Sequence, residues 1–228
     1  MTISIAISVH NRHDVSTKSI NEWKKRLPKG AKLFIVDDGS DLPFPYADIR
    51  NEVALGIAAC KNQCIKLCEG SDYVFLVDDD VFPITDDWHL PYINSGLNHL
   101  CFTFTKYTNG KRSGRNQKGM FDNISIYDLP CGCMNFYTKA CFEAVGGMDI
   151  KYGKWSFEHV GHSMRIFNAG LTPYPFMDVS YSGELFYSYD QDCNIERTVD
   201  KRTRHALASK NFQKYQKELK SKEFIPYG

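Results

Sequence analysis

The chain has 228 residues, with 28 basic and 27 acidic side chains, and 43% of its residues are hydrophobic. This length predicts a single domain with one sizeable core. Because the charges nearly cancel, the composition excludes a protein that binds nucleic acid over its whole surface, and any such affinity would have to be local. No stretch approaches about 18 consecutive apolar residues, and the N-terminus lacks the pattern of a signal peptide. We therefore expect a cytoplasmic protein without a transmembrane segment.

The first hundred residues alternate apolar strands with helices, an order typical of a nucleotide-binding α/β half-sheet. Three cysteines, Cys60, Cys64 and Cys68, recur every four residues on the second expected helix. This spacing places them on one face, which favours packing in the core over a metal site. The expected elements, in chain order, are strand 3–9, helix 14–27, strand 32–36, helix 55–68 and strand 73–77.

Carboxylates follow two of these strands. Asp37 and Asp38 come after the second strand, and Asp78, Asp79 and Asp80 close the third. The carboxyl ends of parallel strands meet at one edge of a sheet, where open α/β sheets bind ligands. Three adjacent carboxylates repel one another unless a positive charge lies between them, and Mg2+ and Mn2+ prefer oxygen ligands. The block predicts a metal site, and the alternative is a polar turn after a strand.

The middle of the chain carries a cationic segment. Residues 106–119 contain five Lys and Arg residues, three glycines and no acid. We expect a mobile loop, which is either a solvated excursion or a lid that closes over phosphate or a polyanionic acceptor. The later elements expected are strands 124–127 and 134–137, helix 158–169 and a polar, basic helix 201–222, whose charges are more typical of a solvated face than of a binding arm.

The order of these motifs resembles that of nucleotide-sugar glycosyltransferases of the GT-A fold, close to glycosyltransferase family 2, the polypeptide N-acetylgalactosaminyltransferases and the β-1,4-galactosyltransferases. The resemblance implies an α/β fold in a single domain, with a mixed, mainly parallel sheet flanked by helices. It divides the chain into a nucleotide-sugar-binding half (1–100), an acceptor-binding and catalytic half (101–192) and a C-terminal basic helical segment (193–228). It covers most of residues 3–180 and rests on Val36 to Ser40, Lys61-Asn62, Phe75 to Asp80, Gly132 with Met134 to Tyr137, Phe142 to Asp149, and Trp155 to His159.

The resemblance also implies roles for single residues. Asp78 and Asp80 would bind Mn2+ or Mg2+, and Glu158 and His159 would be catalytic on the acceptor side. Where this chain has Glu158-His159, the family has Glu-Asp, so the general base of inverting members is missing from its usual place. The third metal ligand is unassigned, and Asp178, Glu184 and His205 are the residues considered for it. The residues expected to bind the nucleotide sugar are Val9, Asn11, Arg12, Asp37, Asp38, Lys61, Asp79 and Trp155.

The resemblance implies a metal-dependent enzyme that moves a sugar from a nucleoside diphosphate donor, expected to be UDP, to the hydroxyl of a glycan or another acceptor. Inverting and retaining outcomes both stay open. Two other functions also stay open: a glycosyltransferase that acts on a modified base in nucleic acid, such as viral DNA, and a catalytically weak nucleotide-sugar-binding module. An aspartate-nucleophile phosphatase also has Asp-x-Asp after an apolar strand, but Phe82 stands where that class has Thr or Val.

Overall fold

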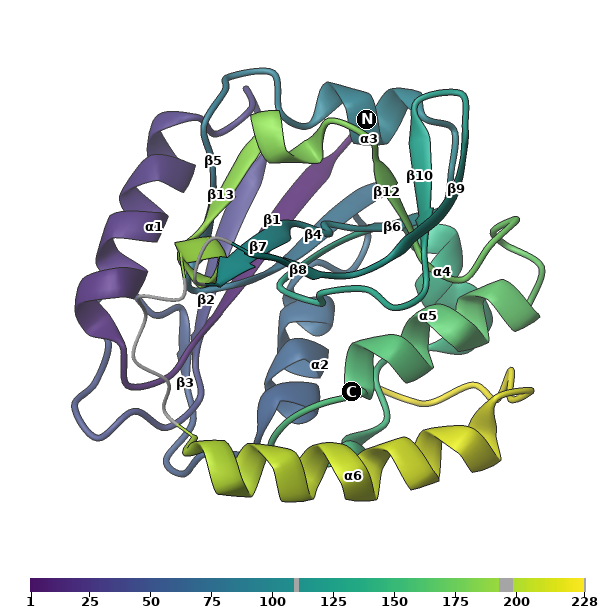
Figure 1. The fold of residues 1–228 in the computed structure, drawn as a ribbon. Helices are drawn as coiled ribbons and strands as arrows, with labels where there is room; N and C mark the ends of the chain where they lie inside the picture. Colours follow the sequence, from purple (N-terminus) through teal and green to yellow (C-terminus); the bar gives the residue numbers. More distant parts are fainter. Residues whose placement is uncertain (109–110, 193–198, 228) are drawn as a thin grey trace.

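A six-stranded sheet forms the centre of the structure (Figure 1). The computed structural model describes residues 1–108, 111–192 and 199–227, without the side chains of residues 105–108, 111–114, 191 and 192. The strand order is β3 (Ile49–Arg50), β2 (Lys32–Asp37), β1 (Ile3–Val9), β4 (Tyr73–Asp78), β11 (Met134–Thr138) and β6 (His99–Cys101). The first four run parallel, and β11 pairs antiparallel with both β4 and β6. This confirms the expected mixed, mainly parallel sheet.

Helices cover both faces of the sheet, which explains why its inner strands are apolar on both sides. They are α1 (His13–Lys25), α2 (Ile57–Leu67), α3 (Leu90–Asn94), α4 (Lys139–Val145), α5 (Glu158–Asn168) and α6 (Lys201–Glu218). Ile5 of β1 lies in the core with α1 and α3, whereas the adjacent Ala6 lies in the core with α2, α4 and α5. Cys60, Cys64 and Cys68 are buried in this second core, as their spacing predicts.

The prediction of a loop over residues 106–119 is wrong, because most of this segment lies in strands. β7 (Thr105–Thr108) and β8 (Lys111–Gly114) pair as an antiparallel hairpin, and β9 (Gln117–Phe121) pairs with β10 (Ile124–Tyr127). Positions 109 and 110 lie outside the described residues, but their Asn-Gly sequence is a common hairpin signal. Charge and composition alone do not reveal that signal. A closing movement of the segment stays a prediction.

The C-terminal part of the chain packs against α5 (Figure 1). Beyond α6, Ile225 forms a bridge with Gly146, and the Arg165 guanidinium donates to the carbonyls of Val145 and Glu223 at 2.6 and 3.0 Å. The chain end is therefore attached to the C-terminal end of α4 and to α5. Within the described parts of the chain, no helix is both long enough and apolar enough to cross a membrane.

Asp178 is a fully buried carboxylate in β12 (Met177–Val179), a strand that pairs with β10. It accepts hydrogen bonds from the Tyr92 hydroxyl at 2.9 Å, the Thr103 amide at 2.7 Å and the Ser182 hydroxyl at 2.5 Å. These donors come from three separate segments. Asp178 therefore joins α3, the chain after β6 and the 3-10 turn Ser182–Glu184.

We expect Asp178→Ala to lower the free energy of unfolding by at least about 3 kcal/mol, because it removes the acceptor of four buried donors, the Val179 amide among them. Urea denaturation measures the loss. Asp86→Ala is the control, since the Asp86 side chain is 92% exposed, and it should cost less than about 0.5 kcal/mol. Equal, small losses in both variants would contradict this role for Asp178.

Candidate active site

The carboxyl ends of β1, β2 and β4 open into a cavity of about 730 Å3. The segment before α5 and the first turn of that helix form the opposite wall. The structure thus brings together residues that are far apart in the sequence, as the resemblance implied. Nine of the twelve expected site residues line the cavity: Val9, Arg12, Asp38, Asp78, Asp79, Asp80, Trp155, Glu158 and His159.

The other three expected residues do not line the cavity. Asp37 is fully buried, and its carboxylate accepts the backbone amides of Ser40 and Phe44 at 2.9 and 3.0 Å. It therefore shapes the turn after β2. The Asn11 side chain accepts a hydrogen bond from the backbone amide of Asp41 at 2.7 Å and so holds the same turn. Lys61, the third, is buried on α2.

Asp38 lines the cavity but is also bonded to the protein. Its carboxylate accepts the backbone amides of Leu55 and Gly56 at 2.8 and 2.9 Å, and the Asn51 side-chain amide at 3.0 Å. These bonds hold the chain that leads into α2. The position of α2, and hence of Lys61, therefore depends on the carboxylate at the end of β2.

Arg12, at the start of α1, neutralises part of the acidic block. Its guanidinium forms ion pairs with Asp79 and, at 3.1 Å, with Asp80, and the Ser16 hydroxyl donates to Asp79 at 2.9 Å. Burial opposes the charge on Arg12, but the two carboxylates outweigh it and raise its pKa. Burial, followed by the charge of Asp79, raises the pKa of Asp80 to about 7 in spite of Arg12.

Lys61 supplies the second buried cation. Its Nζ atom lies 2.9 Å from Oδ1 of Asp78 and 3.0 Å from the carbonyl oxygen of Gly132. Burial favours the neutral amine, but the charges of Asp78 and Glu158 outweigh burial and raise the pKa of Lys61. One ammonium group therefore faces acids on both walls of the cavity.

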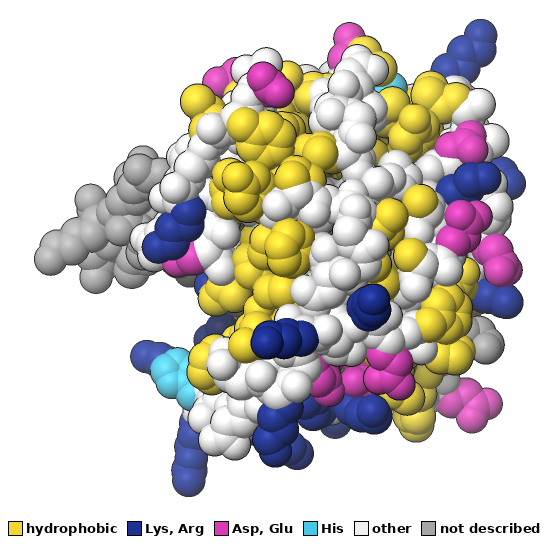
Figure 2. Space-filling model, turned by 90° about the vertical axis from the view of Figure 1, so that its right-hand side faces the viewer, with side chains coloured by type: hydrophobic (Ala, Val, Ile, Leu, Met, Phe, Trp, Pro, Cys, Tyr) yellow, Lys and Arg dark blue, Asp and Glu magenta, His cyan; other side chains and the backbone are white. Residues whose placement is uncertain are grey.

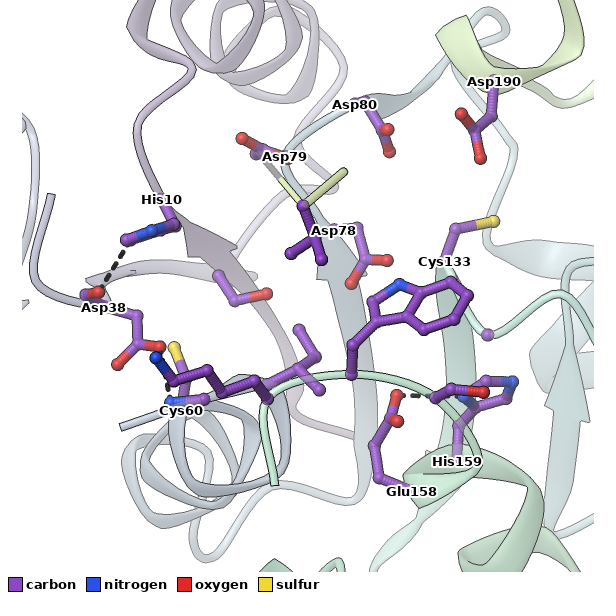
Figure 3. Close-up of a pocket in the computed structure, with 18 of the residues that line it drawn as sticks. His10, Asp38, Cys60, Asp78, Asp79, Asp80, Cys133, Glu158, His159 and Asp190 are labelled. Atoms are coloured by element: carbon purple, nitrogen blue, oxygen red, sulfur yellow. Dashed lines mark hydrogen bonds and ion pairs between the residues drawn. The ribbon is translucent and has the colours of Figure 1, made fainter. Parts of the chain in front are cut away.

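Glu158 and His159 form a pair in the first turn of α5 (Figure 3). Nδ1 of His159 lies 3.0 Å from Oε1 of Glu158. Within the described structure, the buried atoms Oε2 of Glu158 and Nε2 of His159 have no hydrogen-bond partner. A Cβ atom on Gly132 would lie 2.5 Å from the His159 ring, so the close approach requires glycine there. Burial alone would raise the pKa of Glu158, but His159 and Lys61 outweigh it and hold the pKa at about 2.

Sequence reasoning missed several residues that line the cavity, among them Asp190. Asp178, Glu184 and His205, the residues considered for the third metal ligand, do not line the cavity. Figure 3 shows the carboxylates of Asp78, Asp80 and Asp190 turned toward one part of it. A full count of the acids after Gly170 would have found Asp190 in the sequence. Arg115 also lines the cavity, and it belongs to the cationic segment 106–119 that is expected to meet phosphate or the acceptor. The other missed residues with ionisable side chains are His10, Cys60, Cys131, Cys133, Lys154 and Arg204.

The residues present fit a hard divalent cation bound together with a substrate. Within the described residues, no group of three or more His, Cys, Asp and Glu side chains is arranged to hold a metal ion. However, Asp78 and Asp80 each use one oxygen for a basic side chain, and their other oxygens form no hydrogen bond with the described residues. Mg2+ is commonly bound by one or two carboxylates plus substrate phosphates. Two facing carboxylates match that pattern.

No protein-family model matches the sequence, and no curated protein sequence matches it significantly. Solved structures do match the fold. The chain has the GT-A glycosyltransferase fold. GalNAc-T7 with UDP, GalNAc and Mn2+ matches with a TM-score of 0.62 and 14% identity, over 79% of this chain and 42% of that one. The chain therefore spans less than half of GalNAc-T7.

In two further matches, this chain covers a larger share of the matched protein. A mannosyltransferase from Pyrobaculum calidifontis, in complex with GDP-Man and Mn2+, has a TM-score of 0.61 and 12% identity, over 99% of this chain and 66% of that one. TarS from S. aureus in complex with UDP-GlcNAc has a TM-score of 0.60 and 13% identity, over 95% and 73%. The identities are low, so these matches establish the fold, and they confirm the resemblance recognised in the sequence.

The lowered pKa of Glu158 predicts a specific dependence of stability on pH. Because the pKa falls from 4.5 to about 2 on folding, the ionised group stabilises the folded state above its unfolded pKa, and this contribution is lost as the pH falls toward 2. Between about pH 5 and about pH 3, the free energy of unfolding of wild type should fall by about 2 kcal/mol more than that of Glu158→Gln. Urea denaturation of both proteins at each pH measures the difference. Parallel losses would show that the pKa of Glu158 is not lowered.

Proposed function

We propose that the protein is a metal-dependent glycosyltransferase that transfers a sugar from a UDP-sugar to an acceptor hydroxyl. One observation carries the proposal. A single cavity in a GT-A fold is lined by Asp78 and Asp80 on one wall and, on the other, by Glu158 with an unpartnered Oε2 atom. An acidic pair at the strand ends suits a cation and a diphosphate, and an open carboxylate oxygen suits a hydroxyl.

The similar structures support a nucleotide-sugar donor. GalNAc-T7 contains UDP, TarS contains UDP-GlcNAc, and a Drosophila β-1,4-galactosyltransferase 7 contains manganese, UDP-Gal and xylobiose. A divalent ion on Asp78 and Asp80 would neutralise the diphosphate as it leaves. Lys61 holds Asp78 in place, and Arg12 does the same for Asp80. Trp155 and Asp38 line the remaining space, where we propose that the nucleoside and sugar bind.

On the acceptor side, we propose that Glu158 orients the attacking hydroxyl. With its pKa held at about 2, Glu158 is ionised at neutral pH and accepts a hydrogen bond readily. The same low pKa makes it a weak base, because an efficient base has a pKa near the working pH. The role of Glu158 is therefore to direct the hydroxyl through Oε2, while the bond to His159 fixes Oε1.

We expect Asp78→Asn and Asp80→Asn to lower kcat/KM for UDP-sugar hydrolysis in Mn2+ by at least about 100-fold, because each removes a charge that holds the cation. The assay screens UDP-sugars with wild type first. Asp86→Asn is the control and should keep full activity, since Asp86 is exposed and outside the cavity. Near wild-type turnover of either variant in saturating Mn2+ would reject the metal assignment. UDP binding by wild type without hydrolysis would instead indicate a nucleotide-sugar-binding module.

Substitutions of Glu158 distinguish orientation from proton abstraction. Glu158→Gln keeps a hydrogen-bond acceptor and should lower kcat for donor hydrolysis about tenfold, whereas Glu158→Ala should lower it by about 10²-fold or more. Circular dichroism confirms that both variants fold. If the two substitutions instead cause equally large losses, Glu158 acts as the general base.

A further inference from the structure

The segment that carries Trp155 into the cavity has an unusual backbone. Ser156 and Phe157 have φ angles of 78° and 71°, in the left-handed region that non-glycine residues rarely adopt. Phe157 is also the residue before α5, and its hydrocarbon side chain has no group that could cap the helix. Strain of this kind persists only where the surrounding structure holds the backbone in place. The segment from Tyr152 to Phe157 therefore needs an external support.

Asn211 of α6 provides that support. It is 1% exposed, and its side-chain amide donates to three carbonyl oxygens, those of Tyr152 and Trp155 at 2.8 Å and that of Ser156 at 2.9 Å. More than fifty residues separate Asn211 from each of these carbonyls along the chain. A single side-chain amide thus holds three peptide carbonyls, and its two N–H bonds are shared among them.

Other side chains of α6 contact the same segment. The Phe157 ring lies 5.7 Å from Phe212 and 5.5 Å from Tyr215, centroid to centroid. The Arg204 guanidinium lies 5.9 Å from the centre of the Trp155 ring. The inner face of α6 therefore follows the segment along its length.

The outer face of α6 is solvated. Figure 2 shows basic side chains gathered along the lower edge of the molecule, where α6 lies. Lys201, Arg202, Lys210 and Lys217 of α6 are exposed. The exposed cations thus agree with the interpretation of this helix as a solvated face. Its inner face contacts the Tyr152–Phe157 segment, which the charge pattern does not reveal.

We propose that Asn211 is a positioning residue: through its amide, α6 holds the Tyr152–Phe157 segment in the strained backbone that directs Trp155 and Glu158 into the cavity. Glu158 follows Phe157 directly, so a change in that backbone moves the carboxylate as well as the indole. The catalytic consequence rests on the proposed function, but the mechanical consequence does not.

Asn168 supplies a matched control. Its side-chain amide also donates to backbone carbonyls, those of Leu219 and Ser221 at 3.0 and 2.7 Å. It lies at the far end of α5 from Glu158, about 15 Å along the helix axis. Asn168→Ala and Asn211→Ala therefore both remove hydrogen bonds that a side-chain amide donates between the C-terminal region and α5 or the segment before it. Of the two residues, only Asn211 contacts the segment at the cavity.

The first measurement is acrylamide quenching of tryptophan fluorescence in the full chain. Trp23 and Trp88 are fully buried, so quenching reports mainly on the partly exposed Trp155, and Trp155→Phe identifies its share. We expect Asn211→Ala to increase quenching and Asn168→Ala to leave it unchanged. Quenching equal to wild type in both variants would overturn the proposal. If Asn211→Ala does not fold, Asn211→Ser replaces it, since a serine hydroxyl can donate one of the lost bonds and should give a smaller increase.

The second measurement is hydrolysis of a UDP-sugar that wild type accepts. Displacement of Glu158 by about 1 Å should lower kcat by on the order of 100-fold, with a smaller rise in KM, whereas Asn168→Ala should keep wild-type kcat. Unchanged kcat in Asn211→Ala would overturn the positioning role even if quenching increases. If wild type hydrolyses no donor, the proposed function fails, and the quenching comparison still decides whether Asn211 holds the segment.

Discussion

Repulsion among carboxylates at the end of β4 is the constraint on which the rest of the structure depends. Asp78, Asp79 and Asp80 are adjacent in the sequence, and the last two are buried. They stay together because Arg12, the residue before α1, and Lys61 of α2 approach them. Burial raises the pKa of Asp79 and of Asp80 even beside Arg12, and without that cation both pKa values would rise further. The packing of α1 and α2 on the sheet is therefore also an electrostatic requirement of the cavity.

This arrangement couples the two walls of the cavity. Lys61 contacts Asp78 directly, and its charge also lowers the pKa of Glu158, although burial of Glu158 acts in the opposite direction. Gly132 takes part in the same contact, since its carbonyl accepts from Lys61 while its missing side chain leaves space for His159. A change at the acidic block would therefore alter the pKa of Glu158, on the opposite wall of the cavity, through one buried ammonium group.

The sequence is sufficient to predict features that depend on neighbouring residues. The strand ending at Asp78 and the helix beginning at Glu158 follow from apolar spacing and from motifs a few residues long, and the structure has both. Partners distant along the chain are not encoded in this way. Nothing local to Asn211 indicates that it bonds to carbonyls more than fifty residues away. For the same reason Asp37, with a motif resembling that of nucleotide-binding strands, instead caps the turn after β2.

The burial of Lys61 has a practical consequence. Acylating reagents react with the neutral amine of lysine, and this side chain is both inaccessible, at 1% exposure, and held in its charged form. Exposed lysines such as Lys210 would be modified at once, whereas Lys61 would react only during transient openings of the molecule. Mass spectrometry can follow the rate of Lys61 acylation, which would therefore measure how often the protein opens around the acidic block. A bound ligand would slow that rate.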